Sequence, residues 1–176
     1  MFAKKEIHEL YIPIAEYPHI GPEAELGEAF TLLYRLHAEE GKGYRAVLVV
    51  DEDGHLKGIL TMKGMVRAMG PGFLKSKLPQ KGHQPYQGLE TEFPALAHLW
   101  QDQFSEQCRV EAKAKVKEIM DKVKEPVRTT DPIAKAAYLM ILRDTVVLPV
   151  VENGNVVGVV RLVDIFEEMA KALVRE

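Results

Sequence analysis

The pattern of apolar and polar positions repeats along the chain at a distance of one hundred residues. Residues 47–60 read VLVVDEDGHLKGIL and residues 147–160 read VLPVVENGNVVGVV, with six of the fourteen aligned positions identical. Each copy contains an apolar run, a polar turn with Asp-Gly or Asn-Gly, and a second apolar run, which predicts a β-hairpin. Because the apolar residues follow one another without alternation, both faces of each sheet are expected to be buried.

Helical patterns flank both hairpins. Helices are predicted before them, at about residues 23–40 and 132–143, and short extended pieces with proline precede these helices at 11–20 and 127–130. After each hairpin, apolar residues three and four positions apart predict an amphipathic helix. They are Met62, Met65, Val66 and Met69 in the first copy, and Leu162, Ile165, Phe166, Met169 and Leu173 in the second. Both copies therefore read β-α-β-β-α, which predicts an α/β fold.

Residues 70–125 have no counterpart in the repeat and divide the chain into three parts: 7–69, 70–125 and 126–176. Residues 70–90 are rich in glycine and proline, which predicts a loop. Thr91 can then cap a long helix that Pro126 ends, so that about 30 residues would form a helical insertion about 45 Å long. This helix could pack on its own chain or form a dimer contact, and the pattern does not separate the two.

The composition excludes several classes of function. The net charge of −3 and a pI near 6.1 argue against an electrostatic grip on nucleic acid or acidic membranes. The apolar runs are too short for a membrane-spanning helix and the charged opening is no leader peptide, so we expect a soluble, cytoplasmic protein without membrane insertion. The single cysteine, Cys108, and six histidines without metal-ligand spacing predict no metal site. The absence of a nucleophile–base pair predicts that the protein is not an enzyme.

The duplicated element order, with LVVDEDGHLKGILTMKG at 48–64 and LPVVENGNVVGVVRLVD at 148–164, resembles the tandem CBS-domain pair. The resemblance implies two repeats in a pseudo-twofold arrangement with clefts between them. In that family the clefts commonly hold adenosine-containing ligands such as AMP, ADP, ATP or S-adenosylmethionine, and the pairs associate into flat homodimers. The resemblance therefore implies a non-enzymatic regulatory module that senses such a ligand, with no covalent cofactor, and whose state an unknown regulated protein reads.

The ligand motif of the family, Gly-apolar-x-Thr/Ser-x-x-Asp, is split between the two copies. Copy one keeps the hydroxyl at Thr61 but has Gly64 in place of the aspartate, whereas copy two keeps Asp164 and has Arg161 in place of the hydroxyl. A carboxylate can accept hydrogen bonds from ribose hydroxyls, and a guanidinium can donate two to phosphate. A stretch that begins at Val127 matches the family segment that lines the adenine pocket. The candidate ligand-binding residues are Thr61, Val127, Thr129, Thr130, Asp131, Pro149, Arg161 and Asp164.

Each candidate also has a purely structural interpretation. Thr61 stands where a helix begins and can be its N-cap, and Asp164 lies in a first helical turn where a negative charge is favourable. Residues 129–131 can be turn and cap residues. The split motif also supports an alternative function, a ligand-free interaction scaffold that forms a homodimer and docks a partner.

Overall fold

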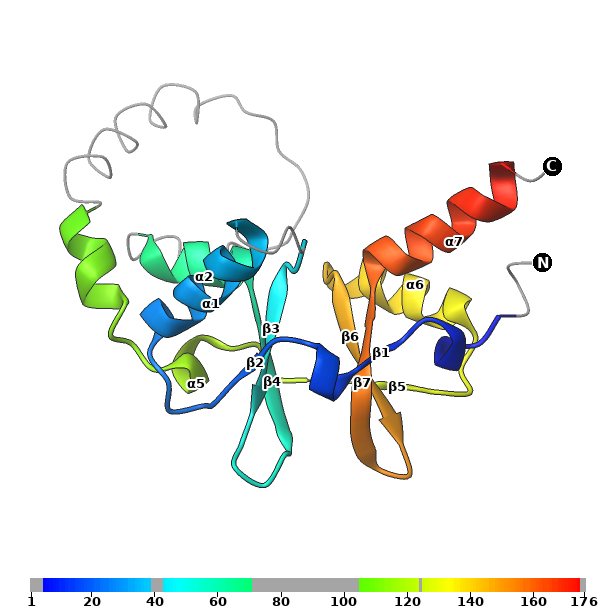
Figure 1. Ribbon diagram of the computed structural model, residues 1–176, viewed down its shortest axis with the longest axis horizontal. Coiled ribbons are helices and arrows are strands. Elements are labelled where there is room, and N and C mark those ends of the chain that lie inside the picture. Colours follow the sequence, from blue (N-terminus) through cyan, green and yellow to red (C-terminus); the bar gives the residue numbers. More distant parts are fainter. Residues whose placement is uncertain (1–4, 39–42, 71–104, 124, 175–176) are drawn as a thin grey trace.

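The computed structural model describes residues 5–38, 43–70, 105–123 and 125–174. It contains two sheets that lie side by side, each with helices at one end and a hairpin turn at the other (Figure 1). The sheet with strand order β2-β3-β4 belongs to the first half of the chain, called repeat one. The sheet with order β1-β7-β6-β5 belongs mainly to the second half, called repeat two.

Both repeats have the predicted element order. Repeat one consists of β2 (His19–Ile20), α1 (Leu26–Ala38), β3 (Ala46–Val50), β4 (Leu56–Thr61) and α2 (Met62–Met69). Repeat two consists of β5 (Val127–Arg128), α6 (Ile133–Arg143), β6 (Val147–Glu152), β7 (Asn155–Arg161) and α7 (Leu162–Val174). The α/β class and the two β-α-β-β-α repeats are thus confirmed.

The predicted hairpins form in both repeats. β3 pairs antiparallel with β4, and β6 pairs antiparallel with β7. The turns contain Gly54 and Gly154, both with φ of +83°, a left-handed conformation that glycine adopts without steric cost. Asn153, with φ of 50°, precedes the second of them, as expected for an Asn-Gly turn.

Each repeat is completed by a segment that precedes the other one in the chain. The short helix η2 (Ile7–Glu9) lies against repeat two, where the Ile7 amide donates to the Asp131 carbonyl at 2.9 Å. The short helix α5 (Val116–Ile119) lies against repeat one, where the Val116 amide donates to the Ala24 carbonyl, also at 2.9 Å. These two contacts occupy equivalent positions in the two halves, which shows the pseudo-twofold arrangement.

The same exchange continues at the last strand of each hairpin. β1 (Ile12–Pro13) pairs with β7 through Ile12 and Val159, and Asp121 bridges to β4 at Ile59. Ile59 and Val159 are exactly one hundred residues apart, so the exchanged segments bind equivalent places. Side chains from both repeats then form one buried cluster between the two sheets. Its members are Tyr17, Ala46, Leu48, Ile59, Val147 and Val159.

The predicted long helix is wrong in its C-terminal half. The helix that crosses residues 105–111 ends at Glu111, a turn follows at 112–114, and only the four residues of α5 are helical after it. The carbonyl groups of Ala112 and Ala114 accept hydrogen bonds from the Gly27 and Leu26 amides at the start of α1. These contacts with repeat one replace the hydrogen bonds that a continuing helix would make. The expected stretches 71–90 and 91–104 lie outside the described residues.

The described part of this segment packs on its own chain. Cys108, Ala112 and Ile119 lie against the buried core of repeat one, which includes Leu26 and Met65. The first of the two roles considered for the segment, packing on its own chain, therefore holds for these residues.

Candidate ligand-binding site

Arg161 and Asp164 meet where β7 passes into α7. Arg161 Nε donates to Asp164 Oδ2 at 2.7 Å, and Arg161 Nη2 donates to Asp164 Oδ1 at 2.5 Å. The three-residue spacing places Asp164 in the first turn of α7, directly above the end of the strand that carries Arg161. The side chains are only 25% and 14% exposed. The hydrogen bond to Asp164 raises the pKa of Arg161, so the guanidinium stays charged.

Two tyrosines of repeat one extend this cluster across the boundary between the repeats. The Arg161 Cζ lies 6.0 Å from the centre of the Tyr44 ring, within the range of a cation–π contact. Tyr17 packs edge-on against Tyr44, with ring centres 5.1 Å apart. The junction cluster of Tyr17, Tyr44, Arg161 and Asp164 is thus built by both repeats.

The Tyr17 hydroxyl is the unusual group in the junction cluster. Tyr17 is 2% exposed, and its hydroxyl has no hydrogen-bond partner within the described parts of the chain. Burial raises the pKa of Tyr17, while Arg161 lowers it and Asp164 raises it. The phenol therefore stays protonated and lies close enough to the ion pair to be influenced by both of its charges.

The equivalent junction in repeat one has a different chemistry. Thr61 Oγ1 accepts a hydrogen bond from the Gly64 amide at 3.0 Å, which makes Thr61 the N-cap of α2. Gly64 supplies no carboxylate at the position of Asp164. The nearby pair of Lys63 and Asp144, at 2.6 Å, is 75% and 65% exposed, so water screens it.

The candidate residues at the start of repeat two are engaged in structural contacts. Val127 is fully buried in the core of repeat two. The Thr129 hydroxyl donates to Glu152 Oε1 at 3.3 Å. Asp131 accepts from the Arg128 amide at 2.8 Å and from Lys135 Nζ at 2.7 Å, as a turn residue does.

These residues lie at the other end of the sheet from the junction cluster. Arg128 pairs with Val151 of β6, whereas Arg161 pairs with Val147. Four residues along an extended strand span about 13 Å. Pro149, buried in the middle of β6, lies between these two ends. The structure thus brings Arg161 and Asp164 together but does not bring residues 129–131 to them.

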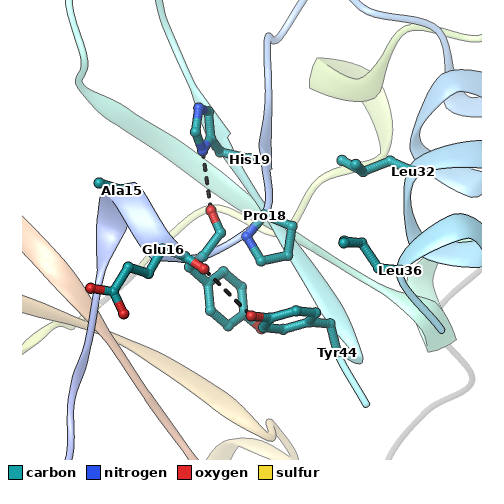
Figure 2. Close-up of a pocket in the computed structure, with 8 residues that line it drawn as sticks. Ala15, Glu16, Pro18, His19, Leu32, Leu36 and Tyr44 are labelled. Carbon is teal, nitrogen blue, oxygen red and sulfur yellow. Dashed lines mark hydrogen bonds between the residues drawn. The ribbon is translucent and has the colours of Figure 1, made fainter. Parts of the chain in front are cut away.

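A shallow pocket of about 280 Å³ lies within repeat one, and both Tyr17 and Tyr44 line it (Figure 2). Leu32 and Leu36 of α1 form one wall, and residues 15–19 form the other. The Tyr44 hydroxyl donates to the Glu16 carbonyl at 3.4 Å and thereby holds its ring at the pocket edge. None of the candidate residues from the sequence lines this pocket.

Among the described residues, the one group of potential metal ligands lies in the hairpin turn of repeat one. Asp51, Asp53 and His55 cluster there, and Asp51 Oδ1 accepts from the amides of the other two at 3.1 and 2.8 Å. A hydrogen bond from Lys57 and one from the His55 amide lower the pKa of Asp51 to about 2. Turn formation accounts for this cluster. No helix in the described parts of the chain is long and apolar enough to cross a membrane.

Sequence reasoning found Arg161 and Asp164 but missed Tyr17 and Tyr44. Both tyrosines lie outside the hairpins and helices whose periodicity carried the sequence interpretation. In the sequence, Tyr17 is marked only by the proline that follows it, and Tyr44 only by its place shortly before β3. Neither position indicates a contact with residue 161.

The chain is thus a tandem two-repeat α/β module. Its β-α-β-β-α repeats exchange their lead-in segments and share a polar cluster at their boundary. The family model for the CBS domain matches residues 7–71 and 116–171, so the chain belongs to the CBS domain family. No curated relative matches the sequence significantly.

Solved structures of CBS-domain proteins share this fold. A CBS-domain containing protein from Agrobacterium tumefaciens has a TM-score of 0.58 and 20% identity, over 87% of this chain and 84% of that one. CBSX2, solved in complex with AMP, has a TM-score of 0.60 and 15% identity, over 95% of this chain and 97% of that one. The cytosolic domain of the Mg²⁺ channel MgtE, solved with ATP, has a TM-score of 0.57 and 23% identity, over 95% of this chain and 50% of that one.

Proposed function

We propose that this protein is a non-enzymatic regulatory module that binds an adenosine-containing ligand between its repeats, at the junction cluster. The observation that carries the proposal is the half-buried pair of Arg161 and Asp164, which tyrosines of the other repeat cover. The complexes of CBSX2 with AMP and of MgtE with ATP, two proteins with this fold, support the choice of ligand.

The chemistry of the pair suits such a ligand. The Asp164 carboxylate can accept hydrogen bonds from both ribose hydroxyls, and the Arg161 guanidinium can donate two parallel hydrogen bonds to a phosphate. Because Tyr44 and Arg161 come from different repeats, a ligand between them would change how the repeats contact each other. A regulated partner protein could recognise that change.

The proposal rests on Arg161 and Asp164 more than on the other candidate residues. Thr61 caps α2, Val127 and Pro149 are buried in strands, and Thr129 and Asp131 have partners within repeat two. A ligand that reached these residues would have to break contacts that already stabilise the fold.

The test of the proposal is a binding screen on the full chain. Thermal unfolding with AMP, ADP, ATP and S-adenosylmethionine should show stabilisation by at least one of them. A ligand that binds only the folded state contributes about 2.7 kcal/mol at one hundred times its dissociation constant. Asp164→Ala should weaken binding of adenosine about tenfold, because hydrogen bonds to a charged group are lost. If millimolar concentrations of every nucleotide leave the melting temperature unchanged, the proposal is wrong.

A ligand-free scaffold that forms a homodimer is the second candidate, and exposed apolar side chains on the helices favour it. Figure 1 shows that α2, α6 and α7 lie at the end of the molecule opposite the hairpin turns. The large exposed apolar residues on these helices are Met62, Val66, Tyr138, Ile141, Leu142, Leu162, Val163, Phe166, Met169, Leu173 and Val174. A contiguous apolar surface built from such residues would mark an interaction site.

Light scattering tests the dimer directly. We expect a mass of twice 19.8 kDa for the wild type and of one chain for Phe166→Asp. A dimer without any nucleotide binding would favour the scaffold, whereas a monomeric wild type would exclude this mode of assembly.

A further inference from the structure

The two groups that the proposed function assigns to a ligand already bind each other. Both Asp164 oxygens accept hydrogen bonds from Arg161, at 2.7 and 2.5 Å. The edge of the guanidinium that faces Asp164 is therefore occupied while this pair is intact. A ligand that uses this edge must take the place of Asp164.

The buried Tyr17 hydroxyl indicates what kind of group completes the site. A buried hydroxyl without a partner is unfavourable, and most such groups in proteins are hydrogen-bonded. Tyr17 is 2% exposed and packs against Tyr44, which in turn lies over the Arg161 guanidinium. These contacts join the Tyr17 hydroxyl, which has no partner among the described residues, to the guanidinium beside which an acceptor would enter.

We propose that Arg161 and the Tyr17 hydroxyl form an anion subsite for a phosphate group, and that the Asp164 carboxylate occupies this subsite when no ligand is bound. A phosphate oxygen pair replaces the two carboxylate oxygens on the guanidinium, since the two groups match its geometry equally well. The Tyr17 hydroxyl donates to a third oxygen. Asp164 is then released and can accept hydrogen bonds from the ligand's hydroxyl groups.

The exchange determines which ligands bind. A phosphorylated nucleoside supplies both a replacement anion for Arg161 and donors for Asp164. A neutral nucleoside, or a nucleoside with a cationic sulfonium group, separates the pair without giving Arg161 a new anion, and should bind more weakly. This preference rests on the proposed function, whereas the anion subsite itself does not depend on a nucleoside.

Inorganic pyrophosphate is the probe that isolates the subsite, because it has no ribose or base. Asp164→Asn removes the competing negative charge and keeps the size of the side chain. Calorimetric titration of the full chain should show that Asp164→Asn binds pyrophosphate about tenfold more tightly than the wild type, as expected for a freed charge-assisted donor pair. Asp144→Asn is the matched control. It frees Lys63 in the same way, but at an exposed place without a buried tyrosine, and should leave the affinity unchanged.

The Tyr17 hydroxyl is tested separately. The double variant Tyr17→Phe with Asp164→Asn should bind pyrophosphate several-fold more weakly than Asp164→Asn alone. The melting temperature of Tyr17→Phe alone should equal or exceed that of the wild type, because the hydroxyl has no partner in the described parts of the chain. Equal affinity for pyrophosphate with and without the hydroxyl would remove Tyr17 from the subsite.

The two proposals fail in different ways. If Asp164→Asn binds pyrophosphate no better than the wild type, or if Asp144→Asn gains as much, the anion subsite is wrong even where the wild type binds AMP. If the gain is found but no nucleotide binds the wild type, the subsite stands and the nucleotide function is wrong.

Discussion

Repeat one and repeat two have the same fold but differ where the last strand passes into the last helix. In repeat one this junction is an N-cap, because Thr61 accepts a hydrogen bond from the Gly64 amide. In repeat two the same two positions are Arg161 and Asp164, which form a half-buried ion pair. The fold thus accommodates two different junctions at equivalent places. The charged junction of repeat two supports the proposal that the ligand binds there.

The repeats also differ in how tightly the exchanged segments approach them. A Cβ atom at Gly158 would overlap the carbonyl oxygen of Ile12, which belongs to a backbone pairing. A Cβ atom at Gly58 would lie 2.7 Å from Met120 Sδ and 2.8 Å from the Asp121 carbonyl. Both glycines thus face a paired backbone carbonyl, and the approach is closer at Gly158, where the distance to the Ile12 carbonyl would be 2.1 Å. Repeat two is the more tightly closed of the two at this place.

The prediction with the greatest change in stability tests this difference in closure. Gly158→Ala should lower the free energy of unfolding by about 3 kcal/mol, because the paired backbone of β1 must shift. Gly58→Ala should cost less, because its Cβ would lie 2.8 Å from the paired Asp121 carbonyl, against 2.1 Å from the Ile12 carbonyl at Gly158. Urea unfolding of the two variants measures both values. Equal losses would mean that the two exchanged segments are held equally firmly.

The next effect concerns the charged junction. Arg161→Ala should weaken AMP binding about tenfold and should not weaken adenosine binding, because the lost partner is phosphate. Thr61→Ala, at the equivalent position of repeat one, should leave both affinities unchanged. Calorimetric titration compares the two ligands on the two variants. A larger loss of AMP binding with Thr61→Ala than with Arg161→Ala would place the site in repeat one.

Thr61→Ala has its own expected effect on stability. Loss of the N-cap hydrogen bond to the Gly64 amide should cost about 1 kcal/mol of unfolding free energy. Thr61→Ser keeps the hydroxyl and should recover most of this loss, and chemical denaturation of both variants distinguishes them. A Ser variant as unstable as the Ala variant would show that the methyl group, rather than the cap, matters.

The smallest effect compares acid sensitivity in the two repeats. Hydrogen bonds from Lys171 and Lys5 lower the pKa of Glu168 in α7 from 4.5 to about 2, and Lys57 lowers that of Asp51 in the repeat-one hairpin from 3.8 to about 2. Since both pKa values fall on folding, each group stabilises the folded state fully above its ordinary pKa, and this stabilisation disappears as the pH falls toward 2.

Replacing either group should therefore make the melting temperature less sensitive to acid. Glu168→Gln should reduce the loss of melting temperature between about pH 5 and pH 2 more than Asp51→Asn does, because the pKa of Glu168 changes further on folding. Thermal unfolding across this range measures both slopes. A slope for Glu168→Gln identical to that of the wild type would contradict the assigned ion pairs.

Much of the fold could be predicted from the sequence, because short-range pattern determines it. The two Gly-containing turns, the runs that form β3, β4, β6 and β7, and the helices α1, α2, α6 and α7 all lie where apolar periodicity indicated them. The N-cap role considered for Thr61 is also a local property, since its partner is three residues away. The prediction of a continuous helix is wrong beyond Glu111. The apolar periodicity continues there, but the Leu26 and Gly27 amides donate hydrogen bonds to carbonyl groups of this segment.

The repeated elements, the charged residues of repeat two and the membership of a two-repeat class can all be predicted from the amino-acid sequence. The folded structure is needed to show that each lead-in segment completes the other repeat, through contacts such as Ile7 with Asp131 and Val116 with Ala24. It is also needed to bring Tyr17 and Tyr44 to Arg161. These interactions join residues that are far apart along the chain. Apolar periodicity indicates which face of a helix or strand is buried. It does not indicate which distant segment of the chain will cover that face.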